Sequence, residues 1–182
     1  DDVSVWHGTD LDLRGKLEER TARRSAEFDL VEFLTREQPA PYWKPIRYNS
    51  QRNIQRYFEG RYLQATLLDA YLDQHELVGG VPPGTDGRII YVICDTLAEA
   101  AEAAGLAESG RDPQLVIVVS GVGLELREAA LEVQCLTEML HDDELTDVDP
   151  LAHAEIQQML DDARAYLDAT QRRLVVPGKD GV

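Results

Sequence analysis

Residues 88–95 read RIIYVICD and residues 114–121 read QLVIVVSG, and these two apolar runs decide the fold class. Both have the length of a β-strand and are rich in β-branched residues. Between them, Thr96 and Glu99 form a T-x-x-E capping box that opens the helical pattern LAEAAEAAGLA. Apolar strands joined by a helix are typical of parallel strands buried on both faces. The sequence therefore predicts an α/β fold with a small, mainly parallel sheet flanked by helices.

The second apolar run leads into a helical pattern over residues 124–140, which completes a β-α-β-α unit in the C-terminal half. A last long helix is expected to end near Leu174 and to bury residues at helical spacing. These are Ile156, Leu160, Ala163 and Leu167. Asp149 and Pro150 are expected to start this helix, as N-cap and first helical residue.

The chain divides at the Gly- and Pro-rich run of residues 79–87. Upstream, residues 1–78 form a mixed, mainly helical region, in which we expect a short strand at residues 3–6 and a helix or helix pair over about residues 10–37. Downstream, residues 88–175 form the α/β unit with its long helices. Because the chain begins with Asp1 instead of methionine, we expect one compact domain cut from a larger protein.

Composition narrows the function classes. The chain has 182 residues, 43% of them hydrophobic, and a net charge of −16. This charge opposes broad, nonspecific binding to duplex nucleic acid, because the long-range field repels phosphate. No apolar run approaches the roughly 18 residues of a membrane span. Cys94 and Cys135 have apolar neighbours, which predicts buried, reduced thiols and a cytoplasmic location.

One stretch has the opposite charge from the rest of the chain. Residues 42–62, YWKPIRYNSQRNIQRYFEGRY, hold six of the twelve aromatic residues and carry a charge of +4, against −20 elsewhere. We call this stretch the basic-aromatic segment. It contains the candidate residues for binding nucleic acid or a partner, which are Trp43, Lys44, Arg47, Tyr48, Arg52, Arg56 and Arg61.

Two interpretations of the basic-aromatic segment stay open. Cations interleaved with aromatic rings suit phosphate neutralisation and base stacking. The same residues suit a structural role, in which arginines pair with carboxylates of the chain and rings pack together. The structural interpretation predicts that at least two arginines form such pairs, with Arg56 and Tyr57 tied into the fold and Arg52 more exposed. Local signals further predict a helix capped by Asn49 or Ser50, then a strand with Gly60 as a bulge.

Asp95 and Ser120 are the candidate ligand residues, because each follows an apolar strand at its carboxyl end. Plainer roles compete with this one: a polar strand terminus at Asp95 and a tight turn at residues 120–123. The sequence lacks the Walker A pattern, the serine-hydrolase elbow and zinc-type clusters. We therefore predict no metal and no cofactor in this segment. The acidic run at residues 141–149 is expected to be a solvated loop that pairs with the basic-aromatic segment.

Two quoted stretches, VWHGTDLDLRGKLEE and RYNSQRNIQRYFEGRYL, together resemble a paired pattern in very large P-loop ATPases of phage defence. These are the ATPases of the BREX and phage-growth-limitation type and related ATP-binding proteins. The resemblance extends loosely over most of the chain, to LDDARAYLDATQRRL near its end. It implies an accessory region whose nucleotide site lies in flanking sequence, and it assigns no catalytic residue.

Taken together, the sequence favours a non-catalytic accessory or coupling module of a larger cytoplasmic ATPase. Its expected partners are the rest of that polypeptide, a partner subunit or DNA, with no membrane. The alternative is an independent small α/β enzyme with its site near Asp95 and Ser120.

Overall fold

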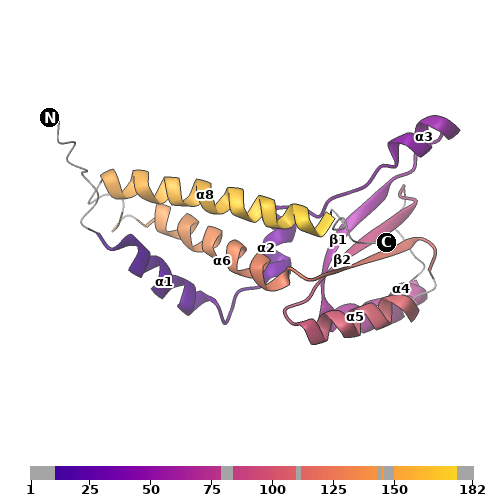
Figure 1. The fold of residues 1–182 in the computed structure, drawn as a ribbon, viewed down its shortest axis with the longest axis horizontal. Coiled ribbons are helices and arrows are strands. Elements are labelled where there is room, and N and C mark those ends of the chain that lie inside the picture. Colours follow the sequence, from indigo (N-terminus) through magenta and orange to yellow (C-terminus); the bar gives the residue numbers. More distant parts are fainter. Residues whose placement is uncertain (1–10, 79–83, 110–111, 143–144, 146–149, 176–182) are drawn as a thin grey trace. The chain divides into compact units, whose positions relative to one another are not determined.

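The computed structural model describes residues 11–78, 84–109, 112–142, 145 and 150–175 of the chain (Figure 1). Its helices and strands are α1 (Leu13–Arg24), α2 (Leu30–Glu37), α3 (Ile46–Arg52), β1 (Phe58–Gln64), a 3₁₀ turn (Ala65–Leu67), α4 (Leu68–Val78), β2 (Gly87–Ile93), α5 (Leu97–Ser109), β3 (Leu115–Ser120), α6 (Gly123–Leu140) and α8 (Pro150–Val175). Among the described residues, no helix is both long and apolar enough to cross a membrane.

The described residues form two compact units, and the residues on both sides of the run 79–87 belong to the same unit. The first unit takes its residues from 11–28 and 127–169, and the second from 29–126 and 170–175. Helices α6 and α8 therefore each contribute residues to both units. The sequence boundary lies inside the second unit, because the strands on either side of it pair in one sheet.

The second unit is built on a three-stranded parallel sheet with strand order β1-β2-β3. The predicted α/β fold with a small parallel sheet is confirmed. β1 pairs with β2 from Phe58 opposite Gly87 to Gln64 opposite Ile93, without interruption. This regular register means that Gly60 is not a bulge, contrary to the expectation.

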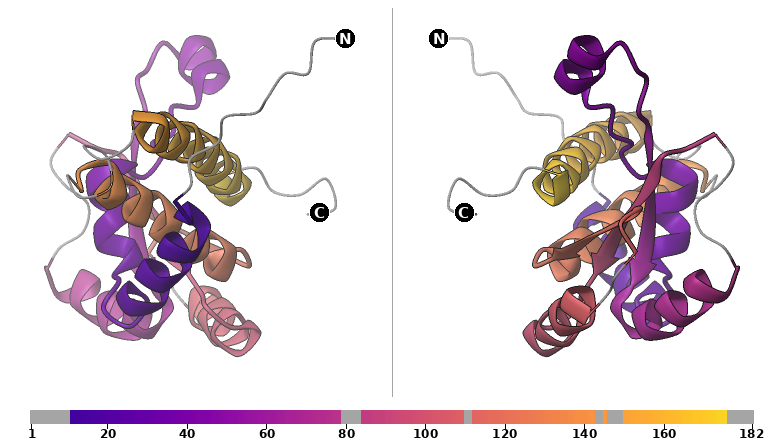
Figure 2. Two further views of the ribbon diagram at one scale, coloured as in Figure 1. Left: turned by 90° about the vertical axis from the view of Figure 1, so that its left-hand side faces the viewer. Right: turned by 90° about the vertical axis from the view of Figure 1, so that its right-hand side faces the viewer.

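One face of the sheet is covered by α4 and α5, which lie on the same side of the strands (Figure 2). Alternate residues such as Leu63, Ile90 and Val92 point to this face and form the core with Leu68 and Ala103. Because side chains alternate along a strand, the neighbouring residues Tyr62 and Tyr91 must occupy the opposite face. The apolar run of β2 is thus explained, since its residues are buried on both faces.

β3 differs from this pattern and corrects the expectation of strands buried on both faces. It is an edge strand, and four of its six residues are only partly buried. Val116 is 43% exposed and lies on the face of Tyr91, opposite Ile89 in the register. The sheet therefore has one face covered by α4 and α5 and one face that is open beside β3.

Helix starts follow local side-chain chemistry. Asp12 caps α1 by accepting a hydrogen bond from the Gly15 N–H at 2.9 Å, so the helix begins later than expected. Asp29 caps α2 in the same way. The predicted capping box at α5 is confirmed, because the Glu99 N–H donates to Thr96 Oγ1. The strand expected at residues 3–6 and the N-cap expected at Asp149 lie outside the described residues.

The first unit contains α1 and the greater parts of α6 and α8. Ile156, Leu160, Ala163 and Leu167 of α8 are buried as their spacing predicted. Two ion pairs join α1 to the end of α6: Arg20 to Asp142 at 2.7 Å and Arg24 to Glu138 at 3.2 Å. The acidic run was expected to pair with the basic-aromatic segment, but Asp142 pairs with Arg20. The other acidic residues of the run lie outside the described part of the chain.

Candidate functional site

The basic-aromatic segment leaves the sheet as a projecting arm and then returns to it. Trp43 and Phe58 form an antiparallel bridge, with both of their N–H to O=C hydrogen bonds at 3.0 Å. Between these two residues, residues 44–57 extend away from the sheet and carry α3 at their tip (Figure 1). We call residues 44–57 the α3 arm.

Backbone and side-chain hydrogen bonds hold the α3 arm in one conformation. The Asn49 side chain accepts from the Arg56 N–H at 3.0 Å and donates to the Arg56 carbonyl at 3.1 Å. Asn53 ends α3 with a left-handed φ of 51°, a conformation that Asn tolerates better than most residues. At the base, the Tyr57 N–H donates to Asp86 Oδ2. α3 begins at Ile46 after Pro45, so Asn49 closes the arm instead of capping the helix.

The cations of the basic-aromatic segment are on the surface. Lys44, Arg47, Arg52, Arg56 and Arg61 are all exposed. Within the part of the chain that the structure describes, none of them forms a salt bridge with a carboxylate. The two or more carboxylate pairs that the structural interpretation predicted are therefore not found there. Arg56 is tied into the fold through its backbone, and its side chain is free to meet solvent.

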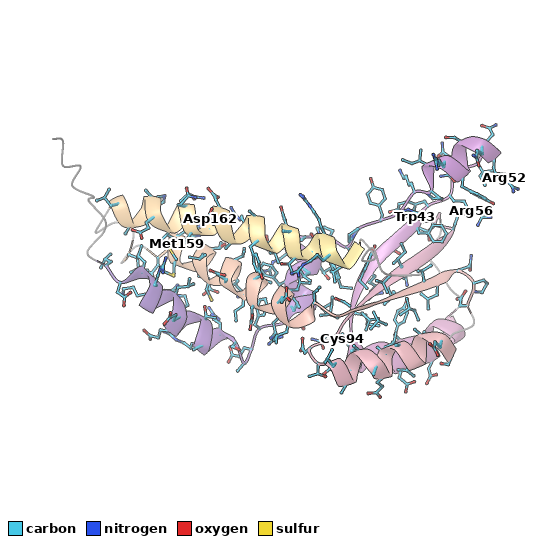
Figure 3. All side chains as sticks on the ribbon, viewed as in Figure 1. Trp43, Arg52, Arg56, Cys94, Met159 and Asp162 are labelled. Atoms are coloured by element: carbon cyan, nitrogen blue, oxygen red, sulfur yellow. The ribbon has the colours of Figure 1, made fainter. Side chains whose placement is uncertain are left out.

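Aromatic rings position these cations. The guanidinium groups of Arg52 and Arg56 lie 5.4 and 5.9 Å from the centre of the Tyr48 ring. Figure 3 shows both arginines on the arm. The Lys44 ammonium lies 5.4 Å from the Tyr42 ring and 5.7 Å from the Tyr57 ring. A guanidinium attracted to an aromatic ring keeps N–H groups available for phosphate or carboxylate. The arm thus presents spaced cations with available donors.

The only acidic residue of the basic-aromatic segment, Glu59, is neutralised by Arg88 of the neighbouring strand. Arg88 of β2 donates to Glu59 Oε2 from Nε at 3.2 Å and from Nη2 at 3.1 Å. The Tyr71 hydroxyl accepts a third hydrogen bond from Arg88 at 2.9 Å. Burial alone would lower the pKa of Arg88, but the contacts with Tyr71 and Glu59 outweigh it and raise the pKa. Glu59 therefore does not cancel the charge of the arm.

The structure separates Arg61 from the other candidates. Arg61 lies on β1 opposite Ile90, on the sheet face that α4 and α5 cover. Lys44, Arg47, Arg52 and Arg56 lie on the α3 arm. Sequence proximity had grouped all five cations, but strand alternation directs Arg61 away.

Next to the base of the arm, the open face of the sheet forms a groove of about 610 Å³. Its floor is made by Ile89, Tyr91, Val116 and Val118, with Trp43 and Phe58 at the arm end. Tyr42 and Trp43 are 61% and 53% exposed at its rim. At the other end lie residues 120–122 and Arg173, which pairs with Glu125. The groove is apolar in its floor and lies beside an arm of free cations.

Pro41, which directly precedes the basic-aromatic segment, is held against the sheet. Its carbonyl accepts a hydrogen bond from the Tyr91 hydroxyl at 3.3 Å. A side chain on Gly60 would overlap this same carbonyl. Gly60 is therefore required by the close passage of residues 40–41 over β1. This role could be suspected from a glycine within a strand pattern, but its partner was not visible in the sequence.

Asp95 and Ser120 lie at the carboxyl ends of neighbouring strands, as expected from their positions. Asp95 is exposed, and its N–H donates to Glu99 within the capping region. Ser120 is buried, and its hydroxyl accepts from the Val122 N–H at 3.2 Å, which forms a tight turn into α6. These contacts support the plainer structural roles of both residues. A catalytic role for them stays a prediction.

Both cysteines are free and buried, as their apolar neighbours predicted. Burial raises the pKa of the Cys94 thiol, and the carboxylates of Glu99 and Asp95 raise it further. Burial also raises the pKa of Cys135. Both thiols therefore stay protonated near neutral pH. Among the described residues, no group of three or more His, Cys, Asp or Glu side chains is arranged to hold a metal ion.

No protein-family model, no curated protein and no solved structure matches this chain. The functional proposals therefore depend on the site and on the sequence itself.

Proposed function

We propose that this chain is a non-catalytic binding module that contacts nucleic acid through the α3 arm, as an accessory region of a larger ATPase of the phage-defence type. The observation that carries the nucleic-acid proposal is the exposure of four arm cations that have no carboxylate partner among the described residues. A chain with a net charge of −16 has many carboxylates available, so free arginines at one place favour an anionic partner from outside.

The contacts inside the arm support this proposal. Tyr48 holds Arg52 and Arg56, and the Asn49 side chain closes the arm on the Arg56 backbone. Cations held at fixed spacing lose less conformational entropy on binding than free side chains do. Arg and Lys contacts to phosphates supply sequence-independent affinity that falls with salt. The arm has the features of such a phosphate-binding surface.

The accessory role rests on the resemblance of the quoted sequence stretches and on the missing Walker A pattern. We expect the isolated chain to neither bind nor hydrolyse ATP. Isothermal titration with magnesium and ATP tests this, and saturable binding at micromolar affinity would contradict it. A reading frame that encodes this segment together with a Walker A motif would support the link to an ATPase.

The nucleic-acid contact is tested with fluorescently labelled oligonucleotides and the whole chain at low salt. We expect the triple variant Arg47→Gln, Arg52→Gln, Arg56→Gln to bind at least about tenfold more weakly, with Lys44 as the one remaining arm cation, while its melting temperature stays that of the wild type. Arg61→Gln is the matched control, because it removes an exposed charge from the same segment but away from the arm. Loss of binding in the control alone, or no binding by the wild type, would overturn the proposal.

A further inference from the structure

The groove beside the α3 arm is lined mainly by apolar and aromatic side chains, which do not themselves bind phosphate. We infer that it receives bases of single-stranded nucleic acid, with Trp43 as a stacking platform, while the arm holds the adjoining phosphates. This inference rests on the proposed function, since it names the class of nucleic acid that the same surface takes.

The groove is suited to flat, apolar groups. Trp43 and Tyr42 keep more than half of their surface exposed at its rim, and Val116 is 43% exposed on its floor. Isolated exposed apolar residues are ordinary, but here they line one concavity together with Ile89 and Tyr91. Its volume of about 610 Å³ lies in the range of roughly 300–1,000 Å³ typical of ligand sites.

The position of the cations identifies the occupant. Tyr42 and Trp43 immediately precede Lys44, and the Lys44 ammonium lies 5.4 Å from the Tyr42 ring. The same short stretch therefore offers two aromatic faces and then the cations of the arm. A nucleic-acid strand has the matching order, in which each base is joined to a phosphate. A purely apolar peptide would leave the cations without a partner, and a free phosphate would leave the groove empty.

The other end of the groove does not offer comparable charge. Arg173 pairs there with Glu125, and the Ser120 hydroxyl already accepts from the Val122 N–H. Phosphates are therefore expected at the arm end and bases over the sheet. Bases of an intact duplex are stacked inside the helix and cannot reach Trp43 or Val116. Single strands expose their bases to aromatic side chains, and each stacked base adds affinity without sequence readout.

The test compares three labelled oligonucleotides of about 12 nucleotides, a length within the known site sizes of single-strand binders. They are a single-stranded thymidine oligomer, the duplex of this oligomer with the complementary deoxyadenosine strand, and an abasic oligomer with the same number of phosphates. Fluorescence anisotropy gives the affinity of each for the whole chain. We expect the thymidine strand to bind about tenfold or more tightly than the abasic strand and the duplex. Trp43→Ala should remove this difference, and Trp43→Phe should retain most of it.

A second readout does not depend on a variant at the site. The chain has two tryptophans, Trp6 and Trp43, so Trp6→Phe leaves Trp43 as the single reporter. Stacking of a base on Trp43 should quench its fluorescence with thymidine oligomer and leave it unchanged with the abasic one. Equal affinities for thymidine and abasic strands, tighter duplex binding, or absent quenching would overturn the inference. If the triple arm variant still weakened all three in that case, the proposed function would stand without it. If no oligonucleotide bound, the proposed function would fail as well.

Discussion

Arg88 on β2 holds Glu59 on β1 through two N–H to carboxylate hydrogen bonds, and this pair neutralises the only acidic residue of the basic-aromatic segment. Only 12% of the Arg88 side chain is exposed, against 39% for Glu59. The pair links adjacent strands at the sheet face that α4 and α5 cover, and its third partner, Tyr71, belongs to α4. Arg88 of β2 thus links β1, through Glu59, to α4, through Tyr71.

Replacing Arg88 by Met should lower the free energy of unfolding by about 1–3 kcal/mol. Breaking a fully buried pair costs about 3–5 kcal/mol, and the partial exposure of Glu59 reduces this loss. Urea denaturation measures the change. Arg61→Met on the neighbouring strand β1 is the control, and it should stay within about 0.5 kcal/mol of wild type because Arg61 is exposed. Equal effects of the two substitutions would contradict the role given to Arg88.

Gly60→Ala should destabilise the protein by about 1–3 kcal/mol, because the added methyl group meets the backbone carbonyl of Pro41. Gly105→Ala provides the matched control. Gly105 lies inside α5 and has open space where the methyl group would be, so this change should stabilise by about 0.5–1 kcal/mol. Thermal melts of both variants decide the question. A neutral Gly60→Ala would show that residues 40–41 do not pass over β1 as described.

The conformation of the α3 arm should depend on Asn49. In Asn49→Ala, the Arg56 N–H and carbonyl lose their partners. Hydrogen exchange at the Arg56 amide should then become at least tenfold faster, while exchange in β1–β3 stays unchanged. Gln51→Ala is a suitable control, since Gln51 is an exposed residue of the same helix. Unchanged exchange at Arg56 in the Asn49 variant would mean that the arm is held by other contacts.

Stability should fall at alkaline pH because of the two buried thiols. Burial raises the pKa of Cys94 and Cys135 in the folded protein, so the folded state holds these protons above the unfolded thiol pKa of about 8.5. Within this window the folded state binds more protons than the unfolded chain, and stability decreases as pH rises. The pKa of Tyr62 and of Tyr91 is also raised by burial, which adds to the loss above about pH 10.

Urea titrations between about pH 8 and pH 10 measure this decrease. The variant Cys94→Ala, Cys135→Ala should show a flatter dependence over that range. Identical slopes for the variant and the wild type, or rapid maleimide labelling of the native protein, would contradict the protonated, buried thiols.

The sequence predicted the elements whose signals are local. The apolar runs, the Thr96–Glu99 capping box and the helical spacing on α8 each specify their own element, and all three are confirmed. The two-unit division could not be predicted in this way. α6 and α8 each look like one uninterrupted helix, and only long-range packing assigns their parts to different units.

The candidate site shows the same limit. Composition revealed the cation-rich segment, but it could not show that Arg61 lies on the sheet, apart from the arm, or that Glu59 is paired with Arg88. Both facts depend on strand pairing with residues 29 positions downstream. The open floor at Val116 was also hidden, because an edge strand with a wholly apolar sequence looks like a central one. Its exposure depends on what covers the sheet, which no local pattern encodes.

The salt dependence of binding to a single-stranded thymidine oligomer tests the central claim most directly. Each phosphate neutralised on a single strand contributes about −0.7 to the slope of log affinity against log salt concentration. With the four cations of the α3 arm engaged, we predict a slope of roughly −2 to −3 for the wild type and for Arg61→Gln. The triple variant Arg47→Gln, Arg52→Gln, Arg56→Gln should fall to about −0.7. A wild-type slope near zero, or a triple variant with the slope of the wild type, would contradict the assignment of the arm as the phosphate-binding surface.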